Sequence, residues 1–145
     1  GPLSGLHQLE ELHLSGTRVR AVKPIHRATG LRRLHLDHTP LEDAEDLAGF
    51  DELELLMLDH TGITSLDPLS GITKLKVLSF SNTVVRDLSP LKYVDKLEWL
   101  YMNDTPVEDL NPLLKLPNLK HVQLSGTPAE KESPSGQANP PEPDR

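Results

Sequence analysis

Two Asp-His pairs are the residues in this sequence whose types most readily suggest chemistry. Asp37 and His38 are followed 22 positions later by Asp59 and His60. Imidazole and carboxylate groups are common ligands of transition-metal ions, so equivalent positions on neighbouring elements could share an ion. Histidine and aspartate beside a turn are more often solvated side chains that support backbone hydrogen bonds. We therefore expect no metal site here.

The remaining histidines and the known motifs give no sign of catalysis. His7, His13 and His26 have no evident partner in the sequence and are expected at the surface. The chain has no nucleophile elbow, no His-Glu-x-x-His zinc motif, no phosphate loop and no dinucleotide-binding fingerprint. We therefore expect neither an enzyme nor a cofactor.

A fixed period of 22 residues organises the elements that would position these side chains. It is visible in two series, Leu9, Leu31, Leu53, Leu75, Leu97 and Leu119, and Thr17, Thr39, Thr61, Thr83, Thr105 and Thr127. A constant period of this size is typical of repeat proteins, in which each unit buries its apolar face against its neighbours.

Each repeat predicts one short strand followed by a tight return. The Leu-x-Leu step has a period of two, which is typical of a strand with one face turned inward. Six such strands should pair in parallel. On the return, Asp67, Ser89 and Asn111 each precede a proline. A capping-type side chain before proline favours a single helical or 3₁₀ turn.

The strand phase also predicts which side chains face solvent. If Leu100 and Met102 point inward, Trp99, Tyr101 and Asn103 point outward, and the period turns these positions into columns. Leu55, Met57, Val77, Trp99 and Tyr101 then form one apolar and aromatic patch flanked by polar residues. The candidate protein-binding residues are Arg33, His35, Leu55, Met57, Val77, Ser79, Trp99, Tyr101, Asn103 and His121.

The exposed aromatic residues have two other interpretations. Trp99 and Tyr101 could pack against a neighbouring domain or flanking segment, or the strand phase could be wrong and bury them. We favour a binding surface, because tryptophan and tyrosine are the usual energetic anchors of protein interfaces. Leu97, Leu100 and Met102 already fill the inward positions.

The pattern resembles leucine-rich repeats of the short 22-residue class, which is found in internalin-like proteins and in a protein phosphatase regulator. Leu-x-x-Leu-x-Leu and the stretch at 87–91 carry this resemblance over about residues 2–129. It implies an α/β fold, a right-handed solenoid with a concave parallel β-sheet and short 3₁₀ or helical turns on the convex side. Threonine stands where the family usually has asparagine, and its hydroxyl can make part of the same hydrogen bonds.

Composition and charge narrow the partner class. The 145 residues are 3% aromatic, carry a net charge of −7 and include no cysteine. An acidic chain repels phosphate backbones, so we expect no nucleic-acid partner. No apolar segment is long enough to insert in a membrane. The lack of cysteine and of a visible signal peptide favours a reducing compartment such as the cytoplasm.

These observations predict a leucine-rich-repeat domain over residues 1–129, with about five full repeats and partial end repeats. Residues 130–145 are rich in proline and lack large apolar side chains, which predicts a disordered tail. The predicted function is noncatalytic binding of a protein partner through the concave sheet face. The alternatives are a structural spacer within a larger protein and a regulator of an enzyme such as a phosphatase. Uncapped end repeats could also associate end to end.

Overall fold

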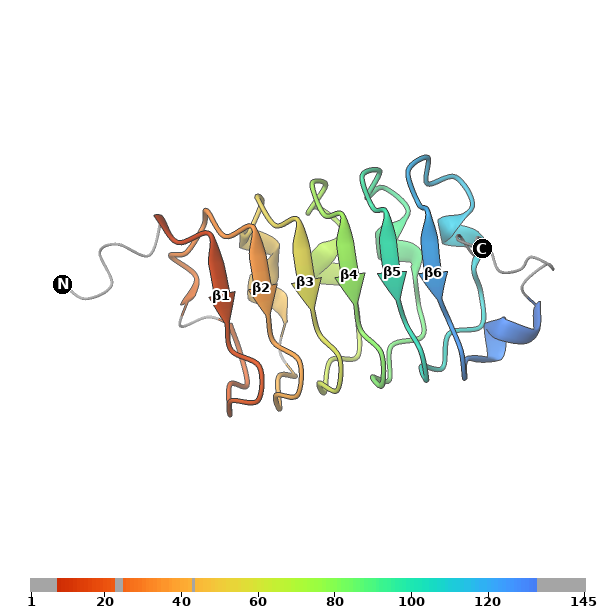
Figure 1. Cartoon of the computed structure of the whole chain (residues 1–145), viewed down its shortest axis with the longest axis horizontal. Helices are drawn as coiled ribbons and strands as arrows, with labels where there is room; N and C mark the ends of the chain where they lie inside the picture. The colour runs from red at the N-terminus through yellow and green to blue at the C-terminus, as the bar shows by residue number, and fades with distance from the viewer. Residues whose placement is uncertain (1–7, 23–24, 43, 133–145) are drawn as a thin grey trace.

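The computed structural model describes residues 8–22, 25–42 and 44–132, and it forms one parallel sheet with short turns behind it (Figure 1). Six strands lie side by side in sequence order. They are β1 (Glu11–His13), β2 (Arg33–His35), β3 (Leu55–Met57), β4 (Val77–Ser79), β5 (Trp99–Tyr101) and β6 (His121–Gln123). Each pairs in parallel with the next, as the repeat predicts.

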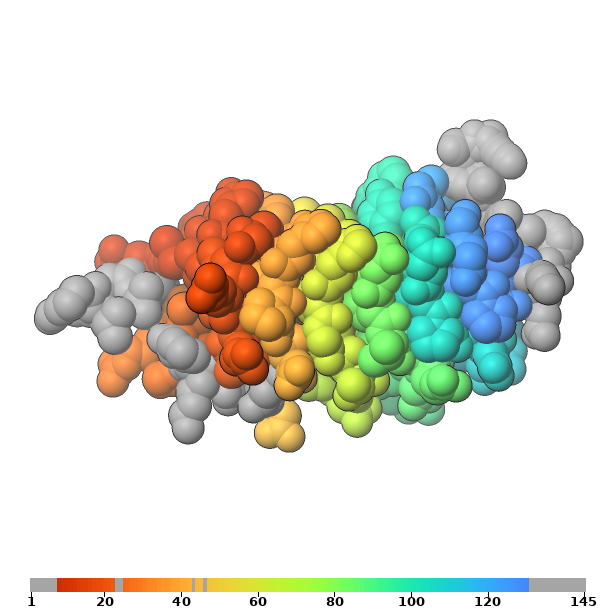
Figure 2. Space-filling model, turned by 90° about the horizontal axis from the view of Figure 1, so that it is seen from below, coloured from red at the N-terminus to blue at the C-terminus, as the bar shows by residue number. Residues whose placement is uncertain are grey.

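The register of the sheet equals the period of the sequence. Leu34 pairs with Leu56, Leu56 with Leu78, and Leu78 with Leu100, so equivalent leucines lie next to each other across the sheet. All four of these leucines are fully buried. Seen from below in Figure 2, the repeats form successive stripes across the molecule. The fold is a leucine-rich-repeat solenoid whose core is a set of aliphatic ladders, with Phe50 and Phe80 among its largest side chains.

The chain contains short 3₁₀ helices outside the strands. They are η3 (Glu45–Gly49), η4 (Asp67–Leu69), η5 (Ser89–Leu91), η6 (Asn111–Leu113) and η7 (Pro128–Glu132). In Figure 1, η3 to η6 lie behind the sheet, and η7 lies beyond β6. In η4, η5 and η6 a proline occupies the first turn, where its missing N–H costs no hydrogen bond. This confirms the predicted 3₁₀ turns.

The capping side chains differ from the prediction. The residues before η4, η5 and η6 in the N-cap position are leucines, which make no side-chain cap. Asp87 Oδ1 instead accepts a hydrogen bond from the Ser89 N–H, and Asp109 Oδ1 accepts one from the Asn111 N–H. The capping oxygen therefore lies two positions before the predicted residue. The Ser89 hydroxyl also donates to Asp87 Oδ1, and this bond together with the one from the Ser89 N–H lowers the pKa of the Asp87 carboxyl.

A threonine closes the turn after every strand. The hydroxyls of Thr17, Thr39, Thr61, Thr83, Thr105 and Thr127 each donate to the carbonyl oxygen three residues earlier, at 2.6–2.8 Å. All but Thr17 are buried. The threonine hydroxyl therefore makes the turn-closing bond that the sequence suggested for it.

The residue before each threonine is left-handed. Gly16, His38, His60, Asn82, Asp104 and Gly126 have φ between 56° and 80°. Glycine reaches this region without strain, and asparagine, aspartate and histidine are enriched there among other residues. His38 and His60 therefore occupy a turn position whose backbone histidine tolerates.

Two predictions concern the ends of the chain. The boundary expected after residue 129 falls inside η7, whose Ala129 is fully buried and donates its N–H to the Val107 carbonyl. Most of the tail expected at 130–145 lies outside the described residues. Among the described residues, no helix has the length and apolarity needed to cross a membrane.

Candidate functional site

The exposed face of the sheet alternates with the core as the strand phase predicts. In β5, Leu100 is fully buried whereas Trp99 is 38% exposed. The same register aligns Arg33, Leu55, Val77, Trp99 and His121 in one column. Trp99 therefore lies on the solvent side of the sheet and not within the stack.

Six residues of β3 to β6 form what we call the aromatic patch: Leu55, Met57, Val77, Trp99, Tyr101 and His121. Trp99 and His121 have ring centroids 5.2 Å apart, and Tyr101 and His121 have centroids 5.9 Å apart. Both pairs are tilted, an arrangement that aromatic rings prefer over face-to-face stacking. His121 thus joins the two larger aromatic side chains across the β5–β6 pair.

Ser79 belongs to the same column as Met57 and Tyr101 but offers little surface. It is 2% exposed, and its hydroxyl donates to Asp59 Oδ1. The same carboxylate oxygen accepts the Ser81 N–H at 2.7 Å. The burial of Ser79 does not support its place among the binding residues, and its hydroxyl holds the Asp59 side chain.

The third column of the sheet face forms a ladder between repeats. Asp59 Oδ1 accepts from Ser81 N, Ser81 Oγ accepts from Asn103 N, and Asn103 Oδ1 accepts from Ser125 N. The Asn103 amide also donates to Gln123 Oε1 at 3.2 Å. Both groups of the Asn103 side chain are therefore engaged within the protein. The strand phase predicts Asn103 on the exposed face, but it does not predict this ladder. The sequence signal that could have indicated the ladder is the recurrence of polar residues at this position of each repeat.

Charge and imidazole groups gather at the other end of the face, on β1 and β2. Arg33 Nε lies 3.3 Å from Glu11 Oε1, and His13 Nε2 donates to Glu11 Oε2 at 2.9 Å. These bonds, that from His13 first, lower the pKa of the Glu11 carboxyl below its ordinary value. Glu11 is therefore ionised at neutral pH.

His13 also stacks on His35, with ring centroids 4.0 Å apart and planes 10° apart. The expectation that His13 has no partner is wrong. The register of β1 against β2 places His13 directly beside His35 on the same face of the sheet, which brings the two rings into contact.

His38 and His60 stack in the same way, with centroids 4.3 Å apart, at the exposed turns after β2 and β3. Their aspartate neighbours bond elsewhere. Asp37 Oδ1 accepts from the Ser15 hydroxyl, and Asp59 Oδ1 from Ser79 and Ser81. The two Asp-His pairs thus act in separate contacts, which agrees with the interpretation of these residues as supports of the turns.

Comparison with known proteins adds a family to this geometry. A family model described as leucine rich repeats (2 copies) matches residues 51–93. Among solved structures, the chain is similar to internalin C2 of Listeria monocytogenes, with 39% identity and a TM-score of 0.84 over 87% of this chain and 56% of that one. A search of curated proteins finds no match.

Two further internalins of the same organism share the fold. An internalin F structure has 20% identity and a TM-score of 0.55, over 86% of this chain and 50% of that one. The functional domain of InlJ, which includes a cysteine ladder, has 22% identity and a TM-score of 0.75, over 86% and 26%. The chain spans about half of the first two proteins and a quarter of the third. The 22-residue repeat, the parallel sheet and these matches identify the chain as a leucine-rich-repeat domain of the short, internalin-like class.

Proposed function

We propose that this domain binds a protein partner through the exposed face of its sheet, without catalysis, and that the aromatic patch is the centre of the binding surface. Leucine-rich-repeat folds are commonly protein-interaction modules. The observation that carries the proposal is the position of Trp99, whose ring is partly exposed beside His121 on an otherwise regular sheet.

The patch has the composition that interface anchors require. Trp99 and Tyr101 combine a large apolar surface with a polar group at one edge, and interface hot spots are enriched in both residue types. Leu55, Met57 and Val77 extend the apolar surface over the two preceding strands, each half-buried. A solvent-facing apolar patch of this kind marks an interaction site more often than a random surface does.

The polar surroundings favour a preformed surface. The ladder through Asp59, Ser81 and Asn103 fixes the backbone at one border of the patch. Three-residue strands in a rigid stack lose little conformational freedom when a partner binds. Binding that needs little ordering keeps more of its interaction energy as affinity.

Substitution at the patch tests the proposal. Partners captured by the wild-type domain are identified, purified and titrated against Trp99→Ala and Tyr101→Ala. We expect each change to weaken binding by about 2 kcal/mol or more, as for interface anchors, with little change in the melting temperature. The matched control is Tyr93→Ala, because Tyr93 is 66% exposed but follows η5 on the other side of the repeat.

Other outcomes favour the alternatives. Equal affinity of wild type and both patch variants would contradict the proposal and indicate a spacer or a different surface. If binding depends on the patch and the domain also changes the rate of a bound enzyme, the partner-binding role extends to regulation. Self-association is read from the mass of the wild-type domain in light scattering over a range of concentrations.

A further inference from the structure

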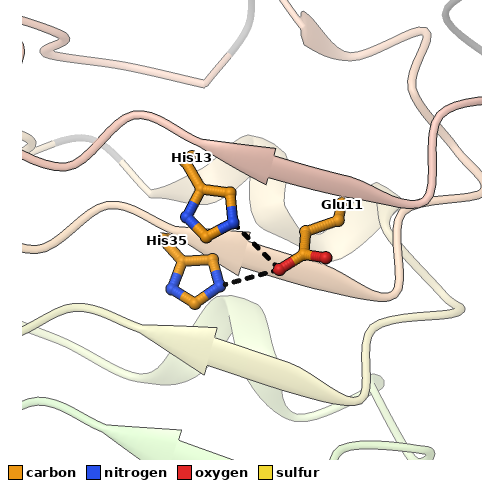
Figure 3. Close-up of side chains that lie close together, drawn as sticks. All are labelled: Glu11, His13 and His35. Atoms are coloured by element: carbon orange, nitrogen blue, oxygen red, sulfur yellow. Dashed lines mark hydrogen bonds and ion pairs between the residues drawn. The ribbon is translucent and has the colours of Figure 1, made fainter.

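Glu11, His13 and His35 bring three metal-ligating atoms together on the sheet face (Figure 3). The carboxylate oxygen and the two imidazole nitrogens all lie within 4.8 Å of one another. In Figure 3 the two rings lie side by side on β1 and β2, and both point a nitrogen at the same Glu11 oxygen. Within the part of the chain that the structure describes, this is the one group of three histidine, cysteine or acidic side chains whose ligand atoms lie so close together.

The distances suit a small tetrahedral ion. Zinc binds histidine nitrogen at about 2.0–2.1 Å and carboxylate oxygen at about 2.0–2.2 Å, so ligand atoms in a tetrahedral site lie about 3.3 Å apart. Glu11 Oε2 lies 2.9 Å from His13 Nε2 and 3.5 Å from His35 Nε2. The carboxylate oxygen is therefore close enough to both nitrogens, and the two stacked rings would have to turn toward a common point for both nitrogens to bind one ion.

Two of the ligand atoms are available to a cation at this point. Arg33 contacts the other oxygen of Glu11, Oε1, which leaves Oε2 turned to the histidines. His35 Nε2 is buried and has no hydrogen-bond partner, because its 3.5 Å contact with Glu11 does not meet hydrogen-bond geometry. Burial of an unpaired polar nitrogen is unfavourable, and coordination would satisfy it.

We propose that Glu11, His13 and His35 form a binding site for a divalent transition-metal ion of the zinc class. Two imidazoles and one carboxylate are a ligand set that zinc takes in proteins, with a fourth position left to water or another ligand. For His13 Nε2 to bind the ion, the proton that it donates to Glu11 in the metal-free form must leave this nitrogen, to Nδ1 of the same ring if the ring is neutral or to solvent if it is protonated. The site lies on β1 and β2, where His35 pairs with Met57 of the aromatic patch, but it does not depend on the proposed binding of a partner.

Calorimetric titration of tag-free, chelator-treated protein with zinc chloride tests the site. We expect one zinc ion per chain, and affinity that falls in acid, because protons compete with the metal ion for its ligands. Glu11→Gln, His13→Gln and His35→Gln should each weaken binding by about 100-fold or more. Loss of an outer partner of a ligand already costs about 10–100-fold, and loss of a ligand costs more.

The double variant His38→Asn, His60→Asn is the matched control. It removes the other stacked histidine pair, and asparagine tolerates the left-handed backbone there. We expect wild-type zinc affinity in this control, and zinc-induced shifts of the His13 and His35 imidazole signals in NMR spectra. No binding to the wild type, or equal loss in the control and in the ligand variants, overturns the proposal. Circular dichroism shows whether each variant is folded. If a histidine variant is misfolded, the zinc affinity of the folded Glu11→Gln variant tests the proposal in its place.

Discussion

At the residue scale, the buried threonines show how one hydroxyl serves the turn after each strand. Thr83 Oγ1 donates to the Phe80 carbonyl at 2.8 Å and also lies 3.4 Å from the Val85 N–H. Thr83 is buried, so no water molecule would take the place of the hydroxyl as a donor to the Phe80 carbonyl. The bond therefore contributes to stability mainly because its loss leaves a buried acceptor unpaired.

Replacing Thr83 by valine tests this account. The shape of the side chain is kept while the hydroxyl is lost, so we expect a destabilisation of about 1–3 kcal/mol from the unpaired Phe80 carbonyl. Thr83→Ser, which keeps the hydroxyl and loses a methyl group, should retain the turn and cost about 1 kcal/mol or less. Urea unfolding of the three proteins gives the comparison. A serine variant less stable than the valine variant would show that methyl packing outweighs the hydrogen bond.

Single residues also mark what the sequence could and could not predict. The outward position of Trp99 and the turn role of Thr83 follow from the period and from strand alternation alone. The His13–His35 stack and the Glu11 contacts required the register of β1 against β2, which fixes pairs 22 residues apart. The rotamers that turn both rings toward one carboxylate depend on side-chain packing, and no spacing in the sequence determines them.

At the scale of the element, the turn after each strand needs one left-handed residue. Asn82 has φ of 60° and lies at the surface after β4, where its N–H donates to the Asn103 carbonyl. The same bond recurs in neighbouring repeats, from His60 to Ser81 and from Asp104 to Ser125. The left-handed residue thus extends the hydrogen bonding of the sheet beyond the three strand residues.

Asn82 offers a test of this requirement. A β-branched side chain is strongly disfavoured at positive φ, so Asn82→Val should destabilise the domain by about 1–2 kcal/mol. Asn82→Gly should leave stability within about 0.5 kcal/mol, because glycine adopts the same backbone without strain. Both values come from the midpoint and slope of urea unfolding. Equal stability of the valine and glycine variants would mean that the turn relaxes to another conformation.

The elements themselves were predictable because their signals are local. Leu-x-Leu steps and Pro-Leu turns recur with a constant period. A strand or turn whose pattern is weak in one repeat can therefore be assigned from the equivalent positions of the others. The capping oxygens were misplaced by two positions, since the 3₁₀ helices begin at Asp67, Ser89 and Asn111 themselves. The ladder through Asp59 and Asn103 was missed because each bond joins a side chain to the backbone of the next repeat, which only the stacked structure brings near.

At the scale of the whole molecule, stability is shared between neighbouring repeats. Among the described residues, each strand pairs only with the strands of the repeats beside it in sequence. In such arrays, stability is approximately a sum of repeat terms and nearest-neighbour interface terms. Leu78 in β4 pairs with Leu56 on one side and Leu100 on the other, and all three are fully buried. Leu12 in β1 pairs with Leu34 and is only partly buried.

This difference predicts a gradient of mutational cost along the solenoid. Leu78→Ala should destabilise the domain by about 2–5 kcal/mol, because it removes a buried rung and leaves a cavity between two repeats. Leu12→Ala makes the same chemical change at a strand with less buried surface, so its cost should fall below about 2 kcal/mol. Urea unfolding measures both. Hydrogen exchange then locates the effect, with amides of β1 opening before those of β4 in the wild type. Equal costs for the two leucines would mean that the solenoid unfolds as a single unit in which the first repeat is held as firmly as the fourth.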